Sequence, residues 1–347
     1  MDIILHCPEN GAEISLLPKK QAEIMSRIPQ IDEDFEIWGS NNVIEPNIWN
    51  KDFTKPTPIQ FMWELRGNLD DITDLFLLLD TNATFENAKV IKISSWQSFC
   101  TLNNLTRGLT YFWKMVAFEG DVISGESAIY SFYVLDELPH WVLLEGAVNI
   151  RDMGGYRTPT GRVKTGMLYR GSEVNRKFIA TPEALEFMQN GMKIKTDLDI
   201  RGYCNIEGQT KSPIPGADWK FYPLLAYKDE MCNKENEENL KKIFSLLAKP
   251  EAYPIYMHCV AGADRTGMLA MMILALLGVS ENDFDTDYEY TSLRIGIYSR
   301  KVRPYKETKE YLKSFGTDIY TGVENYLMYC GVTKFEIDSI RNILIKK

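Results

Sequence analysis

The amino-acid sequence predicts an all-β sandwich followed by an α/β domain in which helices flank a central, mostly parallel sheet. Three observations predict this order. The chain has 347 residues, a comfortable length for two domains. Residues 56–135 contain short alternating stretches separated by turn residues. Beyond about residue 140, apolar stretches alternate with helical patterns. We therefore expect one domain at residues 1–135 and a second at 136–347.

Six stretches of the first domain are rich in the aromatic and β-branched residues that favour strands. The expected strands are Ile59–Leu65, Leu75–Asp80, Lys89–Ser94, Ser98–Asn103, Thr110–Phe118 and Ala128–Leu135. Asp, Asn and Gly residues separate them, and no credible helical pattern lies between them. Strands at this spacing are typical of a β-sandwich.

Residues 104–117 lead into the fifth of these strands through a leucine, a glycine and a tyrosine. This segment resembles the E–F corner of a fibronectin type III domain. The resemblance covers roughly the first 135 residues and implies a fibronectin type III-like accessory domain whose ligand is unknown. The alternative interpretation is a core of packed aromatic residues that binds no ligand.

The strand pattern stops near Asp136, and a proline follows at Pro139. Beyond this break, helical patterns alternate with short apolar stretches, which indicates an α/β layer with a mostly parallel sheet. The expected helices are Pro182–Asn190, Glu237–Ala248, Arg265–Leu277, Lys306–Ser314, Val323–Tyr329 and Lys334–Ile345, and the expected strands are Ile194–Ile200 and Pro254–Met257.

The charge of the chain excludes some classes of partner. A formal net charge of -9 and a pI near 5.1 argue against nucleic-acid and anionic-membrane binding. A phosphorylated ligand needs only a local positive pocket and is compatible with an acidic chain. The longest apolar run, Met268–Val279, is too short to cross a bilayer, so we expect no transmembrane segment.

The residues at the N-terminus lack the basic start and apolar core of a signal peptide. We expect a cytoplasmic protein, with export as the alternative if a signal was removed. The six cysteines are scattered, which suits a reducing compartment, and no Cys-x2-Cys pair occurs among them. With only three histidines in addition, we expect no zinc site, no other metal and no cofactor.

One cysteine differs from the other five. Cys259 is followed six positions later by Arg265; it follows the apolar stretch Tyr253–Met257 and precedes the helical run Thr266–Leu277. The order of strand, loop and helix N-terminus is that of an anion-binding loop. The segment reads His258-Cys259-Val260-Ala261-Gly262-Ala263-Asp264-Arg265-Thr266-Gly267.

This arrangement suits phosphate chemistry. A phosphate cradled by residues 260–265 would face unpaired backbone N–H groups and the positive end of the helix dipole. Gly262 and Gly267 relieve the steric cost of curling the loop around it. Arg265 can bind two phosphate oxygens through its planar fork. The same positive surroundings favour the thiolate form of Cys259, which we expect to be the nucleophile.

Two neighbours have supporting roles in this interpretation. Thr266 can donate a hydrogen bond to the sulfur and help it leave when a thiophosphate intermediate is hydrolysed. His258 either orients the loop through backbone contacts or is a structural histidine, and the residues do not decide between these roles.

The segment resembles the signature His-Cys-x5-Arg-Ser/Thr-Gly of the cysteine-dependent protein tyrosine phosphatase superfamily, and the resemblance covers about residues 140–347. More narrowly, it resembles bacterial tyrosine/serine phosphatases related to secreted phosphatases with phosphoinositide activity. Three further segments are similar to that family: Gly146-Ala147-Val148-Asn149-Ile150-Arg151-Asp152-Met153-Gly154-Gly155-Tyr156, the run from Thr160 to Ser172, and Val323-Glu324-Asn325-Tyr326-Leu327 with Gly331-Val332-Thr333.

One position departs from the family. Ala263 stands where the family loop usually has a lysine, so a positive charge beside the phosphate is missing. We expect catalysis to survive, because Cys259 and Arg265 remain, and we expect a preference for singly phosphorylated substrates.

Two residues compete for the role of general acid, which protonates the leaving oxygen. Asp264 lies inside the loop, where the resembled bacterial family places its acid. Asp229 lies about thirty residues before Cys259, where many eukaryotic relatives carry their acid on a mobile loop, although a solvated charge run is its plainer interpretation. We favour Asp264 and keep Asp229 as the alternative.

Three further charged residues have structural interpretations. We expect Arg151 and Asp152 to pair beneath the phosphate loop as a scaffold, with direct substrate contact as the alternative. Arg201 follows an expected strand and is expected to form a structural salt bridge.

The sequence therefore predicts a phosphate monoester hydrolase that acts through a phosphocysteine intermediate on a phosphorylated protein or peptide. Its expected specificity is for phosphotyrosine, or for phosphotyrosine and phosphoserine together, and a phosphoinositide is the alternative substrate. Other readings are a rhodanese-like sulfurtransferase or arsenate reductase on a similar loop, and a phosphate-binding or adhesion protein with weak catalysis. The Arg265-Thr266-Gly267 ending argues against the sulfurtransferase.

Overall fold

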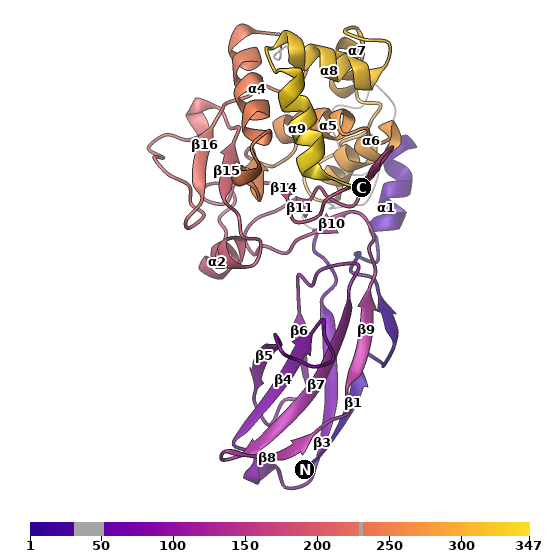
Figure 1. Ribbon diagram of the computed structural model, residues 1–347, viewed down its shortest axis with the longest axis vertical. Coiled ribbons are helices and arrows are strands. Elements are labelled where there is room, and N and C mark those ends of the chain that lie inside the picture. Colours follow the sequence, from indigo (N-terminus) through magenta and orange to yellow (C-terminus); the bar gives the residue numbers. More distant parts are fainter. Residues whose placement is uncertain (31–51, 229–231) are drawn as a thin grey trace. The chain divides into compact units, whose positions relative to one another are not determined.

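The computed structural model describes residues 1–30, 52–228 and 232–347. These residues form two compact units (Figure 1): Met1–Leu17 with Pro56–Glu137, and Pro18–Lys55 with Leu138–Lys347. From the sequence we expect a single boundary after residue 135. The structure differs because α1 (Gln21–Arg27) belongs to the second unit, where Gln21 accepts a hydrogen bond of 2.7 Å from the Trp141 indole.

The first unit consists of two sheets that share one core. One sheet contains β1 (Asp2–Cys7), β3 (Ile59–Arg66) and β6 (Phe99–Leu102). The other contains β2 (Ala12–Ile14), β9 (Tyr130–Val134), β7 (Thr110–Glu119), β4 (Asp74–Asp80) and β5 (Lys89–Ile93), and β8 (Val122–Glu126) pairs with β7. Between the sheets, Phe61 packs edge-on against Trp113 and Phe132. Each of the six expected strands has a counterpart, whereas β1, β2 and β8 were not expected.

The second unit is built on a mixed sheet whose parallel strands lie at its centre. The order is β10 (His140–Trp141), β11 (Arg151–Asp152), β14 (Leu168–Gly171), β17 (Ile255–His258), β15 (Thr196–Asp199) and β16 (Asp218–Phe221). The last four are parallel to one another, and β10 and β11 pair in antiparallel fashion. A small separate sheet contains β12 (Arg157–Thr158), β13 (Gly161–Val163) and β18 (Ile345–Lys346).

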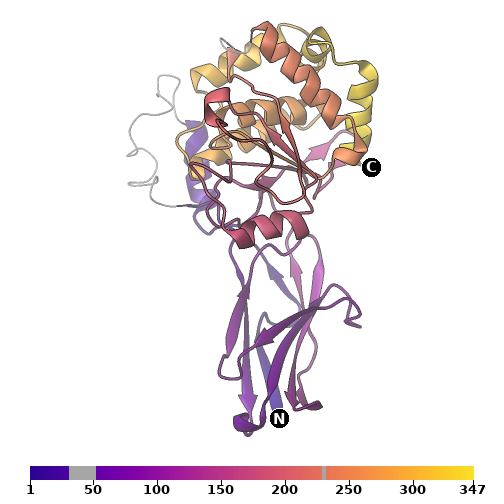
Figure 2. The ribbon, with the colours of Figure 1, turned by 90° about the vertical axis from the view of Figure 1, so that its left-hand side faces the viewer.

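Helices cover both faces of this sheet. They are α2 (Pro182–Asn190), α4 (Lys234–Leu247), α5 (Asp264–Leu276), α6 (Glu281–Glu289), α7 (Arg303–Lys313), α8 (Ile319–Tyr329) and α9 (Lys334–Leu344). On β17, Ile255 and Met257 join the core with α4, α5, α8 and α9, whereas Tyr256 joins the core with α2. Figures 1 and 2 show α2 apart from the other helices. All four residues of β17 are buried, as is usual for a strand covered on both faces.

The six expected helices are all present, but several begin earlier than the apolar pattern indicates. Asn233 caps α4 and Asp318 caps α8 through their side chains, and the first turn after each cap is polar or only partly apolar. Helix α6 was not expected at all. Its nine residues include five acidic ones, so its sequence resembles a solvated acidic loop.

His258 ends β17 and is tied to the neighbouring strand β15. Its Nε2 atom lies 2.9 Å from Oδ1 of Asp197, both side chains are buried, and its ring stacks on Tyr256. Burial alone would lower the pKa of His258, but the charges of Asp197 and Asp199 outweigh it and raise the pKa to about 9. A charged His258 therefore fixes the strand end that leads into the loop at Cys259.

This ion pair makes the stability of the second unit depend on pH. Histidine in an unfolded chain titrates near 6.5, so the contribution is fully present below about pH 6.5 and is lost as the pH rises through about 9. We expect the melting temperature of the wild-type protein to fall between about pH 6.5 and 9. In the Asp197→Asn variant the melting temperature should change much less over the same interval. Thermal unfolding followed by circular dichroism at stepped pH measures both. Parallel curves for the two proteins would contradict the assignment.

Candidate active site

A loop of five residues, 259–263, joins the end of β17 to the first residue of α5. It lies at the carboxyl end of the parallel strands, the edge at which open α/β sheets bind ligands. Cys259 is the first residue of the loop and only 2% of it is exposed. Asp264 and Arg265 follow the loop and are both partly exposed.

The carbonyl groups of residues 260–263 all accept hydrogen bonds, those of 260–262 from the surrounding scaffold and that of Ala263 from the first turn of α5. The donors are the N–H of Glu173 to Val260, the side-chain amide of Asn149 to Ala261 and Gly262, the guanidinium of Arg170 to Gly262, and the N–H of Gly267 to Ala263, at 2.6–3.4 Å. Carbonyl oxygens repel anions. Because donors of the protein already bind these oxygens, the carbonyls repel an anion at the loop less strongly.

The backbone N–H groups of the same residues, 260–263, have no acceptor among the described residues. The first N–H groups of α5, at Asp264 and Arg265, have no partner inside the helix either. Gly262 makes the curl possible: its φ is +66°, and a Cβ there would lie 2.3 Å from the backbone of Gly171. N–H groups without a protein acceptor at a helix N-terminus are suited to bind an anion.

Arg265 adds a full positive charge. Among the described residues its guanidinium makes no hydrogen bond and no ion pair. It lies beside Gly202, since a Cβ at Gly202 would be 3.8 Å from its Nη1. Thr266, the next residue, is completely buried, and its hydroxyl has no hydrogen-bond partner in the described structure. An unpaired arginine and an unpaired buried hydroxyl are the groups that a bound phosphate and a thiolate would complete.

A buried group of three charges holds the scaffold. Asp287 on α6 binds Nε of Arg151 at 2.9 Å and Nη1 of Arg170 at 2.5 Å. Burial alone would raise the pKa of Asp287, but the two arginines lower it to about 2. Burial and the charge of Arg151 lower the pKa of Arg170 to about 10. Arg151 also binds Oδ1 of Asn149 at 2.6 Å, so both side chains that hold Gly262 are anchored to this group.

The expected pairing of Arg151 with Asp152 is wrong. The two residues are adjacent on β11, where alternate side chains point to opposite faces, and Arg151 pairs with Asp287 instead. Asp152 accepts hydrogen bonds from the N–H groups of Gly154 and Gly166. Both residues therefore belong to the scaffold, but in separate interactions.

Arg201 forms the expected structural salt bridges. It binds Asp199 and Glu173, each at 2.6 Å, and is completely buried. Asp229, the alternative general acid, lies outside the described residues. Asp264 lies beside the loop, and its carboxylate accepts a hydrogen bond of 2.8 Å from the hydroxyl of Tyr227. Ala263 is fully buried in the core and contributes no charge to the site.

Sequence reasoning did not single out Asn149, Arg170, Asp287 or Tyr227 as functional. Asn149 and Arg170 lie inside motifs that resembled the bacterial family, and this was a usable signal. For Asp287 the only signal in the sequence is weak: Ser280 is a residue type that often precedes a helix, and in the structure it caps α6 by accepting a hydrogen bond from the N–H of Asp283.

No helix in the described part of the chain is long and apolar enough to span a membrane. Residues 1–30, 52–228 and 232–347 also contain no group of three or more His, Cys, Asp or Glu residues arranged to hold a metal ion.

A search of curated proteins found no match. Among solved structures, the chain is similar to the core catalytic domain of the PP-IP phosphatase SIW14 from S. cerevisiae in complex with citrate, with 18% sequence identity and a TM-score of 0.31, over 46% of this chain and 89% of that chain. Residues 142–346 match the family model of the tyrosine phosphatase family. Because this match spans more than half of the 347 residues, the chain belongs to the tyrosine phosphatase family.

Proposed function

We propose that the second unit hydrolyses phosphate monoesters through a phosphocysteine intermediate on Cys259, and that its substrates are phosphotyrosine residues of proteins or peptides. The observation that carries the reaction is the polarity of the loop: every carbonyl of residues 260–263 accepts a hydrogen bond, whereas their N–H groups and Arg265 are unpaired among the described residues. A phosphate dianion satisfies these donors.

In the proposed first step, the thiolate of Cys259 attacks phosphorus while the loop amides and Arg265 hold the other three oxygens. The bond from phosphorus to the ester oxygen breaks, and that oxygen takes a proton from the general acid, which we assign to Asp264. In the second step water attacks the phosphocysteine, Asp264 takes a proton from the water, and the sulfur leaves as a thiolate. The unpaired hydroxyl of Thr266 is available to donate to that sulfur.

Replacing the nucleophile tests the reaction. We expect Cys259→Ser to lower turnover of p-nitrophenyl phosphate by roughly three orders of magnitude or more, because a serine hydroxyl is un-ionised at neutral pH. Vanadate binding should persist, since the amides and Arg265 are unchanged. Cys100→Ser, in the first unit, is the control and should leave both quantities as in the wild type. Turnover by the Cys259→Ser protein near the wild-type rate would exclude Cys259 as the nucleophile.

An aromatic surface supports a phenyl ester as substrate. Gly202 borders the guanidinium of Arg265, and the next residue, Tyr203, is 64% exposed. The ring of Tyr203 packs edge-on against Phe221 at 5.4 Å, and Phe221 stacks on Trp219 at 5.7 Å. A tyrosine ring whose phosphate is held by Arg265 would meet this surface. The absence of a cation at Ala263 also supports a singly phosphorylated substrate over a polyphosphoinositide.

The first unit supports a separate proposal, that it is a fibronectin type III-like accessory domain. The hydroxyl of Tyr111, on β7, accepts a hydrogen bond of 2.9 Å from the N–H of Thr106, five residues upstream. A tyrosine bonded back in this way is a feature of immunoglobulin-like sandwiches. The resemblance of the second unit's motifs to bacterial phosphatases supports a bacterial origin.

Removing the aromatic ring at position 203 tests the choice of substrate. An aromatic pair contributes about 0.5–1.5 kcal/mol, so we expect Tyr203→Ala to raise KM for a phosphotyrosine peptide by roughly three- to tenfold. KM for an alkyl phosphate should not change. Tyr329→Ala on α8 is the matched control, because Tyr329 is equally exposed at 65%. Equal effects on both substrates, or a wild-type preference for polyphosphoinositides, would contradict the proposed specificity.

A further inference from the structure

The carboxylate of Asp264 lies among tyrosine hydroxyls that come from distant parts of the chain. The hydroxyl of Tyr227 donates to Oδ1 at 2.8 Å. The hydroxyl of Tyr298 lies 3.4 Å from Oδ1 and 3.3 Å from Oδ2. A third hydroxyl, of Tyr288 on α6, is 2.9 Å from that of Tyr227. Both oxygens of Asp264 are therefore contacted, but unequally.

The direction of these hydrogen bonds follows from the number of protons. A phenol has one proton to donate, and Tyr227 gives it to Asp264. The oxygen of Tyr227 then accepts a hydrogen bond from the hydroxyl of Tyr288, so the hydrogen bonds run from Tyr288 through Tyr227 to Oδ1. Among the described residues, Oδ2 has a single contact, the hydrogen bond of 3.3 Å from the hydroxyl of Tyr298. Oδ2 is therefore held more weakly than Oδ1 and keeps the capacity to bind a further partner.

The tyrosine hydroxyls are held as donors. Burial raises the pKa of Tyr227, Tyr288 and Tyr298 above the usual range of the phenol, and the negative charge of Asp264 raises all three further. Their rings are also fixed. Tyr298 packs edge-on against Tyr288 at 5.4 Å, and Tyr288 stacks on Tyr305 at 4.0 Å.

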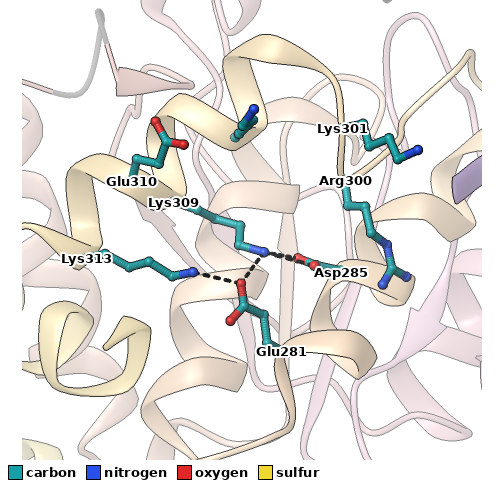
Figure 3. A pocket seen from close by; sticks show the side chains of 8 residues that line it. Glu281, Asp285, Arg300, Lys301, Lys309, Glu310 and Lys313 are labelled. Atoms are coloured by element: carbon teal, nitrogen blue, oxygen red, sulfur yellow. Dashed lines mark hydrogen bonds and ion pairs between the residues drawn. The ribbon is translucent and has the colours of Figure 1, made fainter. Parts of the chain in front are cut away.

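Figure 3 shows ion pairs that join α6 to α7, the helices that carry Tyr288 and Tyr305. The hydroxyl of Tyr305 donates to Asp285 at 2.8 Å. Lys309 binds Asp285 at 2.8 Å and Glu281 at 2.7 Å, and Lys313 binds Glu281 at 3.0 Å. These groups lie at a cavity of about 310 Å³ lined by Glu281, Asp285, Arg300, Lys301, Lys306, Lys309, Glu310 and Lys313. The two carboxylates on α6 and the two ammonium groups on α7 pair with one another, and these ion pairs hold α7 against α6. Tyr305 on α7 is thereby held against the ring of Tyr288 on α6.

Tyr227 itself is held in a costly backbone conformation. Its φ is +64°, in the left-handed region that residues with a side chain rarely adopt. The next residue, Lys228, donates its N–H to the hydroxyl of Thr308 on α7 at 2.9 Å. Strain of this kind persists only where the surroundings fix the residue, and it gathers at functional sites. Here it places the hydroxyl of Tyr227 on Asp264.

We propose that Tyr227 and Tyr298 are positioning residues that fix the carboxyl of Asp264 so that Oδ2 faces the leaving oxygen of the substrate. The proposal rests on the proposed function, in which Asp264 is the general acid. As the sulfur of Cys259 bonds to phosphorus, the electron pair of the breaking bond goes to the ester oxygen. That oxygen takes the proton from Oδ2, and the negative charge left on the carboxylate is met at Oδ1 by the hydroxyl of Tyr227.

Leaving-group dependence distinguishes positioning from a merely structural role. A poor leaving group needs the proton, whereas p-nitrophenolate hardly does. We expect Tyr227→Phe and Tyr298→Phe each to lower the ratio of kcat/KM for an alkyl phosphate to that for p-nitrophenyl phosphate by roughly tenfold, a part of the roughly 100- to 10,000-fold that a general acid contributes. Measured on one sample, this ratio is independent of the fraction of protein that is folded.

Tyr326→Phe is the matched control and should keep the wild-type ratio. Tyr326 is also fully buried in the second unit, but its ring packs on Phe315 and Tyr311. An unchanged ratio in both Tyr227→Phe and Tyr298→Phe would overturn the proposal, and so would an equal loss of rate on both substrates.

Two further variants separate this proposal from the proposed function. Asp264→Asn should lower the ratio by at least as much as the tyrosine variants, and adding Tyr298→Phe to it should lower the ratio no further. If Asp264→Asn keeps the wild-type ratio and Asp229→Asn lowers it, the assignment of the acid fails and the positioning proposal fails with it. If Asp264→Asn lowers the ratio and neither tyrosine variant does, only the positioning proposal fails.

Discussion

Two buried arginines share one buried carboxylate, that of Asp287, and the shape of the phosphate loop depends on this interaction. Arg151 and Arg170 are both completely buried, so each needs the counter-charge that α6 supplies. From this group, Arg170 reaches the carbonyl of Gly262 directly and Arg151 reaches it through Asn149. Loss of Asp287 would leave two like charges close together in the core. The interaction thus makes the position of the loop a consequence of packing between α6, β11 and β14.

The scaffold gives the loop two chemically different sides. Its carbonyls accept hydrogen bonds from the protein, whereas the N–H groups of residues 260–263 have no partner among the described residues. Arg265 stays outside the buried group of charges and keeps its guanidinium unpaired among the described residues, unlike Arg151, Arg170 and Arg201. The net charge of -9 therefore says little about this site. Local donors decide what binds, and the acidic remainder of the chain affects partners with extended negative surfaces.

The sequence was informative where function depends on neighbours along the chain. The spacing of Cys259 and Arg265 between a strand and a helix predicted the loop, and α5 lies within one residue of its expected bounds. The sequence patterns did not predict contacts between residues that are far apart along the chain. Asp287 is 136 residues from Arg151 and lies on a helix whose acidic sequence resembles a loop. Adjacency favoured Asp152 as the partner of Arg151, although strand alternation separates the two side chains. Tyr227 lies 37 residues before Asp264 and Tyr298 lies 34 residues after it, yet both contact its carboxylate. No periodic pattern in the sequence predicts these contacts.

The central claim is that the loop directs a phosphoryl group to the sulfur of Cys259. Rapid acid quenching of the enzyme during turnover of p-nitrophenyl phosphate, followed by peptide mass spectrometry, tests it most directly. We expect one phosphoryl group on the peptide that contains Cys259. We expect a larger yield of this phosphopeptide from Asp264→Asn, because no carboxylate takes the proton from the attacking water. A phosphoryl group on another residue, or none under conditions of demonstrated turnover, would contradict the account.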